Sequence, residues 1–296
     1  MRETRASVTE CSVVQFFFSR DAFDTELRLY SNVALANIMP KCYAAHDNAD
    51  GHLRDDRGRA FPPVLVMGRG ESLDEFVARV EYEEFTVLQA LVLVVKRIVA
   101  LHGLGIVHRD LKPSNILRMP ELHSWALIDF GCAAYDGTFL RPRVVRFCRY
   151  GRTRTDVYRQ GSRARAGCEA SLSFTLTYAP PEVVRAYKDG ERSITAKKSA
   201  DIWSLGVIAY EMLVGSPTFP AGTHPDIVID AVMGRVPLPW ESATAAELRP
   251  LMRLKHVTLQ CLHRDESKRP DAQQVLGAMQ GIFRAATTTT RRTHIV

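Results

Sequence analysis

The chain has 296 residues, 46% of them hydrophobic and 24% charged, which is the composition of an ordinary soluble globular protein with room for one large domain or two small ones. Its six cysteines are scattered and form no C-x-x-C pair, which argues against a disulfide framework or a zinc site and indicates an intracellular protein. The net charge of +6 is local: residues 141–165 hold nine arginines and one acid, Asp156, which leaves +8 there and −2 for the rest of the chain. Nucleic-acid binding is therefore not expected of the fold as a whole.

The first quarter of the chain is predicted to hold two strands and a helix. Residues 12–18 are β-branched and aromatic, which is typical of a strand. Asp21 is expected to cap a helix that runs to Tyr30, with apolar residues at helical spacing. The polar, glycine-containing segment 46–59 is expected to be a loop or the end of a hairpin, and a second strand is predicted at 64–67.

Helices are predicted to dominate from residue 72 onward. Ser72 and Glu75 have the spacing of a capping box, which opens a helix. Residues 87–101 carry apolar side chains along one helical face, with Gly103 as the expected C-cap. Residues 202–213 are apolar around nearly the whole helical circumference, which indicates a helix in the middle of the core.

No segment is predicted to cross a membrane. The longest apolar run, Leu91 to Val95, ends at Lys96 and Arg97 and is too short to span a bilayer. The opening residues also lack the order of a secretory signal. We therefore expect a cytoplasmic location, with the nucleus as the alternative, and no membrane partner.

The segment from His108 to Asn115 (HRDLKPSN) carries the chemistry. Phosphoryl transfer needs a hydroxyl aimed in line and negative charge that is neutralised. The carboxylate of Asp110 can accept the hydroxyl proton, Lys112 can meet the transferred group, and the amide oxygen of Asn115 can hold a metal ion. Asp129 follows a predicted strand at 125–128, where its carboxylate can bind the Mg²⁺ that bridges phosphate oxygens.

H-R-D-L-K-P-x-N followed by D-F-G resembles the catalytic and metal-binding loops of eukaryotic-type protein kinases of the Ser/Thr kind. The resemblance assigns Asp110 as the catalytic base, Lys112 as the charge near the γ-phosphate, and Asn115 and Asp129 as magnesium ligands. It implies ATP and Mg²⁺ as cofactors and proteins as substrates. The implied fold class is α+β, with a small, incomplete β-rich N-lobe and a large, mainly helical C-lobe.

Three further matches lie beyond the catalytic loop. The residues from Thr175 to Glu182 (T-x-x-Y-x-x-P-E) resemble the end of a kinase activation segment, and the hydroxyl of Thr175 is expected to hold the catalytic loop. Asp201 resembles the acid that ties down the backbone of that loop. Arg269 resembles the arginine that pairs with Glu182. We interpret these last two roles as structural.

The N-terminal part departs from the kinase pattern. The strand lysine is replaced by Gln15, whereas Glu26 matches the glutamate that this lysine normally binds. No glycine precedes Ser12, so the printed chain has no room for a glycine-rich loop over the phosphates. An amide hydrogen bond is worth about 1 kcal/mol against about 1.5–3 for a charged one, so phosphoryl transfer should slow roughly tenfold or more. Lys41 is the only substitute lysine before residue 96, and we interpret it as a solvated residue on a strand edge.

The hinge residues are transferred from the resemblance by position only. Val66, Met67, Gly68 and Gly70 are predicted to line the adenine edge through backbone groups, with Met67 as the gatekeeper. A buried strand followed by a plain turn would need the same residues.

The arginine-rich block makes the activation segment unusually long, with 53 positions from Asp129 to Glu182. We predict an insertion at about 136–168. It is either a docking site for acidic or phosphorylated partners or for RNA, or else a disordered insertion or a wrongly bounded gene.

The predicted organisation is a kinase domain at 12–284, divided into a partial N-lobe (12–69) and a C-lobe (70–284), and a disordered tail at 285–296. The leading interpretation is ATP-dependent phosphoryl transfer to Ser/Thr hydroxyls of proteins. The alternatives are a pseudokinase that acts as a binding or scaffold module, or an inactive fragment of a longer kinase. The oligomeric state is not predicted.

Overall fold

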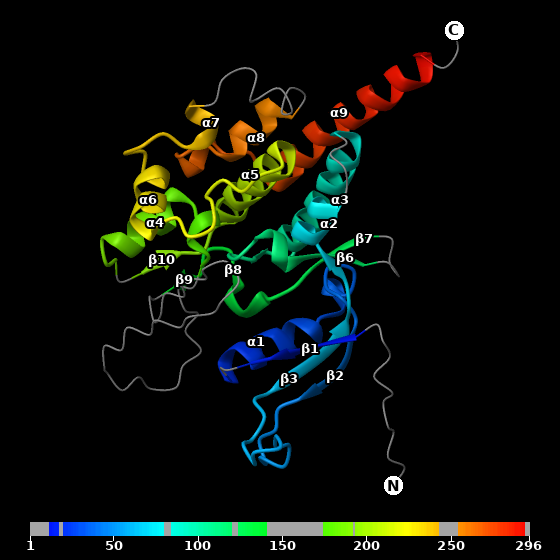
Figure 1. Ribbon diagram of the computed structural model, residues 1–296, viewed down its shortest axis with the longest axis vertical. Coiled ribbons are helices and arrows are strands. Elements are labelled where there is room, and N and C mark those ends of the chain that lie inside the picture. The colour runs from blue at the N-terminus through cyan, green and yellow to red at the C-terminus, as the bar shows by residue number, and fades with distance from the viewer. Residues whose placement is uncertain are drawn as a thin grey trace.

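The computed structural model describes residues 12–17, 20–79, 84–119, 124–140, 174–191, 193–242 and 254–293, and the account below concerns these residues. They form a small lobe of strands with one helix and a large, mainly helical lobe (Figure 1). This is the predicted α+β architecture.

The small lobe is an antiparallel sheet covered by one helix. Its strand order is β1 (Ser12–Phe16), β3 (Val64–Gly68), β2 (Cys42–His46), and α1 (Arg20–Tyr30) lies beside it (Figure 1). The strand predicted at 64–67 is confirmed, and the strand predicted at 12–18 is confirmed as far as Phe16. Strand β2 was not predicted, because its sequence CYAAH has neither β-branched residues nor a clear alternation.

The start of α1 differs from the prediction by one residue. The helix begins at Arg20, so Asp21 lies in its first turn and is not the N-cap. The polar segment predicted as a hairpin end at 46–59 does connect β2 to β3, which pair antiparallel.

A small apolar cluster holds α1 against the sheet. It consists of Phe17, Phe23, Leu65 and Met67, and the rings of Phe17 and Phe23 meet edge to face with centroids 5.5 Å apart. Because Gln15 pairs with Leu65 in the strand register, this packing also sets Gln15 against α1.

A tight crossing joins the two lobes. After β3 the chain passes Gly70, where an added Cβ would lie 2.8 Å from both Leu117 Cβ and Met119 Sδ. The capping box then forms as predicted: the Ser72 N–H donates to Glu75 Oε2 at 3.0 Å, and the Glu75 N–H donates to Ser72 Oγ at 3.4 Å. At position 70 only glycine lets the backbone pass this close to residues 117–119.

The large lobe is built around two buried helices, α3 (Glu84–Gly103) and α5 (Lys198–Val214). As predicted, α5 is buried on nearly every face. The other elements of this lobe and of the crossing are β4 (Glu71–Ser72), α2 (Leu73–Arg79), β5 (Ile106–Val107), η2 (Pro113–Asn115), β6 (Ile116–Met119), β7 (Ser124–Leu127), η4 (Phe130–Cys132), β8 (Ala134–Tyr135), β9 (Phe139–Leu140), η5 (Leu176–Tyr178), α4 (Pro181–Lys188), β10 (Ile194–Thr195), α6 (Pro225–Val232), α7 (Pro239–Ser242), α8 (Lys255–Cys261), η7 (Glu266–Lys268) and α9 (Ala272–Thr293), and η1 (Val33–Leu35) follows α1 in the small lobe.

By length and composition alone, one helix of the described residues could cross a membrane, the segment Phe85–Gly103 of α3. This segment is longer than the apolar run from Leu91 to Val95, because it also includes the charged residues Lys96 and Arg97. More than half of it is buried inside the protein, where it packs on α5, α9 and β7. That burial is what a core helix shows. Gly103 was predicted to be the C-cap but is the last residue of the helix, and the left-handed glycine that follows is Gly105, with φ 74°.

The prediction of a disordered tail from residue 285 is wrong as far as Thr293, because α9 continues to that residue. The helix is anchored on α3 by the stacked rings of Phe85 and Phe283, whose centroids are 4.8 Å apart. Once packing has fixed one part of a helix, each further residue adds a backbone hydrogen bond, so residues of modest helix propensity can continue it.

Replacing Gly206 with alanine is expected to lower the free energy of unfolding by about 1–3 kcal/mol. The added Cβ would lie 2.8 Å from Leu262 Cγ and 2.9 Å from Cys261 Cβ, where α5 packs directly on α8. Urea denaturation would measure the change. The matched control is Gly277→Ala on α9, which has open space around it and should gain about 0.5–1 kcal/mol. A Gly206 variant as stable as this control would contradict the close packing.

Candidate active site

The catalytic loop is held from below by Asp201 of α5. This fully buried carboxylate accepts the N–H of His108 at Oδ2 and the N–H of Arg109 at Oδ1, both at 2.8 Å. His102 Nε2 lies 2.9 Å from Asp201 Oδ2. Burial would raise the pKa of Asp201, but the His102 hydrogen bond, the charges of His102 and His108 and the Arg109 N–H hold it below its ordinary value. The predicted tie between Asp201 and the loop is confirmed.

Two contacts join the catalytic loop to the metal-binding loop. Arg109 has a left-handed backbone, with φ 71°, and its Nη1 donates to the carbonyl of Cys132 at 2.6 Å. His108 Nε2 lies 3.0 Å from the carbonyl of Ile128. A left-handed non-glycine residue is costly, and it persists where surrounding contacts determine it, as they do here.

The carboxylate of Asp110 is the centre of the site. Lys112 Nζ donates to its Oδ2 at 2.8 Å, and Thr175 donates to its Oδ1 through both Oγ1 (2.7 Å) and the backbone N–H (3.0 Å). Burial alone would raise the pKa of Asp110, but the Lys112 ammonium and the Thr175 hydroxyl keep it below its ordinary value. Asp110 is thus an ionised acceptor, and the hydroxyl of Thr175 holds the loop as predicted.

Asn115 and Asp129 present oxygen donors near this centre. Asn115 Nδ2 donates to the carbonyl of Asp110 at 2.9 Å, which leaves its amide oxygen as a donor for a metal. The Ile128 N–H donates to the carbonyl of Asn115 at 3.0 Å and links the two segments. Asp129 has a left-handed backbone, with φ 59°, and its half-buried carboxylate forms no ion pair within the described residues. One carboxylate and one amide oxygen fit Mg²⁺, which is usually held by few protein oxygens together with phosphates and water.

The position of the kinase lysine is occupied by Gln15, whose side-chain amide lies beside the carboxyl group of Glu26. Gln15 Nε2 donates to Glu26 Oε2 at 3.3 Å, which confirms that Gln15 faces the expected glutamate. Glu26 is fully buried, and its Oε1 has no hydrogen-bond partner. Burial, and then the charge of Asp129, raise the pKa of Glu26 to about 8. The hydrogen bond from Gln15 and the backbone N–H groups of Asp129 and Phe130 lower this pKa, but only in part. None of these groups forms a hydrogen bond to Oε1. A neutral amide therefore leaves this acid without a cation.

Lys41 does not replace the missing lysine in this arrangement. It is exposed, and its Nζ lies 5.4 Å from the ring centroid of Tyr43. Within the described residues it forms no ion pair with Glu26 or Asp129. This agrees with the interpretation of Lys41 as a surface residue beside a strand.

The hinge residues lie at the end of β3, next to β1. Met67 is buried and its Sδ is 3.5 Å from the hydroxyl of Tyr30, whereas Val66 is half-buried on the opposite face of the strand. The Gly68 N–H donates to the carbonyl of Lys41 at 2.9 Å, so it is engaged within the sheet. The nucleotide-binding roles of Val66, Met67, Gly68 and Gly70 stay predictions, and Gly68 could not offer its N–H without giving up this bond.

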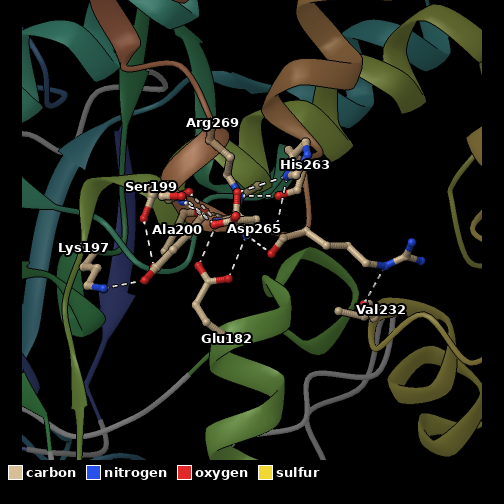
Figure 2. Close-up of polar contacts among 12 residues, drawn as sticks. Glu182, Lys197, Ser199, Ala200, Val232, His263, Asp265 and Arg269 are labelled. Atoms are coloured by element: carbon tan, nitrogen blue, oxygen red, sulfur yellow. Dashed lines mark hydrogen bonds and ion pairs between the residues drawn. The ribbon is translucent and has the colours of Figure 1, made fainter.

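Arg269 and Glu182 form a bidentate ion pair, as predicted. Nη1 and Nη2 of Arg269 each lie 2.7 Å from an oxygen of Glu182, and Figure 2 shows the two side chains facing each other. Arg269 also donates to the carbonyls of His263 (2.8 Å) and Ser199 (2.9 Å). The pair joins the end of the activation segment to the segment before α9.

Three supporting contacts were not predicted from the sequence. His102 binds Asp201, Ser204 Oγ donates to the carbonyl of Tyr178 at 2.8 Å, and Tyr178 donates its hydroxyl to Glu211 at 2.8 Å. The position of His102 at the end of a predicted helix, six residues before His108, could have indicated it. The other two depend on side chains that meet only after α5 packs under the activation segment.

The arginine-rich block and the rest of residues 141–173 lie outside the described residues. Of the insertion predicted at about 136–168, only the first residues are described; Phe139–Leu140 form β9 and pair with β10 (Ile194–Thr195), and the bounds of the insertion stay a prediction.

The two-lobed fold and this loop arrangement define a protein kinase domain. The family model for the protein kinase domain matches residues 21–279, so the chain belongs to this family. It is 30% identical over 219 residues to ribosomal protein S6 kinase 2 alpha of Xenopus laevis, covering 71% of this chain and 25% of the relative. It is also 28% identical over 230 residues to ribosomal protein S6 kinase alpha-1 of Rattus norvegicus (75% and 26%) and 29% identical over 228 residues to ribosomal protein S6 kinase alpha-2 of Homo sapiens (75% and 26%). The chain thus spans about a quarter of the length of these relatives.

Proposed function

We propose that this chain is a Ser/Thr protein kinase that transfers the γ-phosphoryl group of ATP to hydroxyl groups of protein substrates. The observation that carries the proposal is the ionised Asp110, held between Lys112 and Thr175 beside the oxygen donors Asn115 and Asp129. The likeness to S6 kinases supports the Ser/Thr class. We expect it to act in the cytoplasm, with the nucleus as the alternative.

Each residue of this group has a chemical task. Asp110 accepts the proton of the substrate hydroxyl through Oδ2 or Oδ1, after the substrate displaces the Lys112 ammonium or the Thr175 hydroxyl that now donates to that oxygen. Lys112 lies 2.8 Å from Asp110 and places an ammonium beside the incoming phosphoryl group. Asn115 and Asp129 would hold Mg²⁺, which when bound neutralises charge on the phosphate oxygens.

A pseudokinase that acts as a binding or scaffold module is the second candidate. It is favoured by Gln15, which gives Glu26 a neutral partner and offers no positive charge to the nucleotide phosphates. We favour slow phosphoryl transfer over none because the large lobe carries the carboxylate, ammonium and amide groups that the reaction needs, at Asp110, Lys112 and Asn115.

Replacing Asp110 with asparagine is expected to reduce phosphoryl transfer at least about a hundredfold, because the amide keeps the shape but cannot take the hydroxyl proton. Incorporation from labelled Mg-ATP into the chain itself and into generic Ser/Thr protein substrates would measure it. The control is Asp56→Asn in the exposed β2–β3 connection, which should act like the parent chain. If a folded sample of the parent chain incorporates no more label than the Asp110→Asn variant, the kinase proposal is rejected in favour of the pseudokinase.

Replacing Lys41 with alanine is expected to leave phosphoryl transfer within about twofold of the parent rate, a change near the thermal energy and hence negligible. The physical reason is its exposed position over Tyr43, where it forms no ion pair with Glu26 among the described residues. The same incorporation assay would measure it. A loss comparable to that of Asp110→Asn would instead assign Lys41 to the phosphates.

A further inference from the structure

Strand β1 lies at an edge of the small-lobe sheet, and among the described residues it pairs with β3 alone. The N–H of Phe17 donates to the carbonyl of Pro63 at 2.8 Å, which fixes the alternation of this antiparallel ladder. In that alternation the odd-numbered residues of β1 bond to β3, and the backbone N–H and C=O groups of Val14 and Phe16 point away from the sheet. The edge therefore presents backbone groups that a further strand could bind.

The side chains of β1 are those of an interior strand. Val13 on the α1 side of the sheet and Val14 and Phe16 on the outer face are 36%, 44% and 46% exposed. Apolar side chains on both faces are typical of a strand that is buried inside a sheet. Natural edge strands are instead protected by charged residues, proline or a bulge, and Ser12–Phe16 has none of these. This edge is thus suited to pairing.

The outer face of the sheet, opposite α1, extends this apolar surface beyond β1. Phe16 stacks on the exposed Phe61, with ring centroids 6.1 Å apart. Asn48, which has a left-handed backbone with φ 47°, donates through Nδ2 to the carbonyls of Leu53 (3.0 Å) and Phe61 (2.7 Å). These bonds hold the exposed Leu53 beside Phe61. Exposed apolar side chains that are contiguous and held in place mark a surface for a protein partner.

We propose that the β1 edge binds a second copy of this chain, with the two β1 strands antiparallel around a two-fold axis at Val14. In an antiparallel pair, hydrogen bonds join opposite residues whose backbone groups both face the partner strand. The outward-facing positions of β1 are symmetric around Val14, so in this register Val14 lies opposite Val14 of the second copy and Phe16 opposite Ser12. A register shifted by two residues would pair fewer of these positions.

The charge of the edge also favours a copy of the same chain as the partner. No residue of Ser12–Phe16 or Val64–Gly68 is charged, so a second copy brings no like charges together across the strand pair. Two strands of five residues bury less than the roughly 1,600 Å² of a standard interface, so we expect a weak, reversible dimer. The dimer does not rest on the proposed function, because it needs only backbone pairing and apolar contact.

The test is sedimentation velocity of the full chain from about 1 μM to several hundred micromolar, the range in which weak interfaces associate. The parent chain is expected to shift from monomer to dimer as its concentration rises. Val14→Lys and Val14→Glu should each weaken the association about tenfold, because like charges would lie directly opposite each other at the axis. An equimolar mixture of these two variants should recover the dimer, since opposite charges then meet. The matched control is Val33→Lys, which changes an exposed valine outside the sheet and should associate as the parent does.

Three results would overturn the proposal. The first is a parent chain that stays monomeric over the whole range, and the second is a parent-like dimer in both single variants. The third is a mixture of the Val14→Lys and Val14→Glu chains that associates no better than either chain alone. Thermal unfolding would verify that each variant is folded. If a charged variant folds poorly, Val14→Pro replaces it, because proline removes only an outward N–H at this edge and should still abolish the dimer.

Discussion

Replacing Arg269 with alanine is expected to lower the free energy of unfolding by about 3–5 kcal/mol. The Arg269 side chain is fully buried and makes a two-pronged ion pair with Glu182 (Figure 2). Its removal would leave Glu182 without its cation and would remove one hydrogen bond each to the carbonyls of His263 and Ser199. The guanidinium also lies 5.2 Å from the ring centroid of Trp203, so the variant loses packing on the central helix as well.

Urea denaturation of the variant beside the parent chain would measure the loss. The neighbouring Lys268→Ala is the control, because Lys268 is exposed and its contact with Asp265 is long, at 3.9 Å; it should change stability by less than about 1 kcal/mol. Arg269→Lys should fall between the two, since an ammonium cannot reproduce the fork. Equal stability of the Arg269 and Lys268 alanine variants would show that the buried pair contributes nothing.

Replacing Gln15 with lysine is expected to raise phosphoryl transfer about tenfold or more. Gln15 already faces Glu26 across 3.3 Å, so a lysine there can bind the Oε1 atom that now lacks a partner and present positive charge toward the phosphates. The ammonium would also lower the pKa of Glu26, which burial and Asp129 now raise to about 8. The acid would then remain ionised at neutral pH.

Initial rates with saturating Mg-ATP would measure this gain. Gln15→Met is the control, because it has a similar length but no charge and should not exceed the parent rate. A lysine variant no faster than the methionine variant would mean that the charge at this position does not limit the reaction. The double variant Gln15→Lys, Glu26→Gln should lose most of the gain, because the lysine would no longer be oriented.

The sequence by itself accounts for the proximity of the candidate catalytic residues. Asp110, Lys112 and Asn115 lie within six consecutive residues, and Asp129 follows the next hairpin, so short-range chain geometry alone keeps them together. The buried helix around residues 202–213 was also evident, because a segment that is apolar on all sides has no stable place except a core. The resemblance to kinases correctly paired Gln15 with Glu26 and Arg269 with Glu182, although 87 residues separate the second pair.

Only the tertiary structure decided where β2 and the end of α9 form and which buried polar groups find hydrogen-bond partners. Strand β2 exists because β3 offers it a hydrogen-bonding edge, not because CYAAH favours a strand, and α9 continues to Thr293 from an anchor on α3. The close contact at Gly206 depends on where α8 comes to rest. Above all, the burial of Glu26 beside Asp129 with one oxygen unpartnered arises from the meeting of α1, β1 and the metal-binding loop. The solvation and the charge balance around Glu26 depend on all the elements packed there, so the residue pattern of one segment cannot predict them.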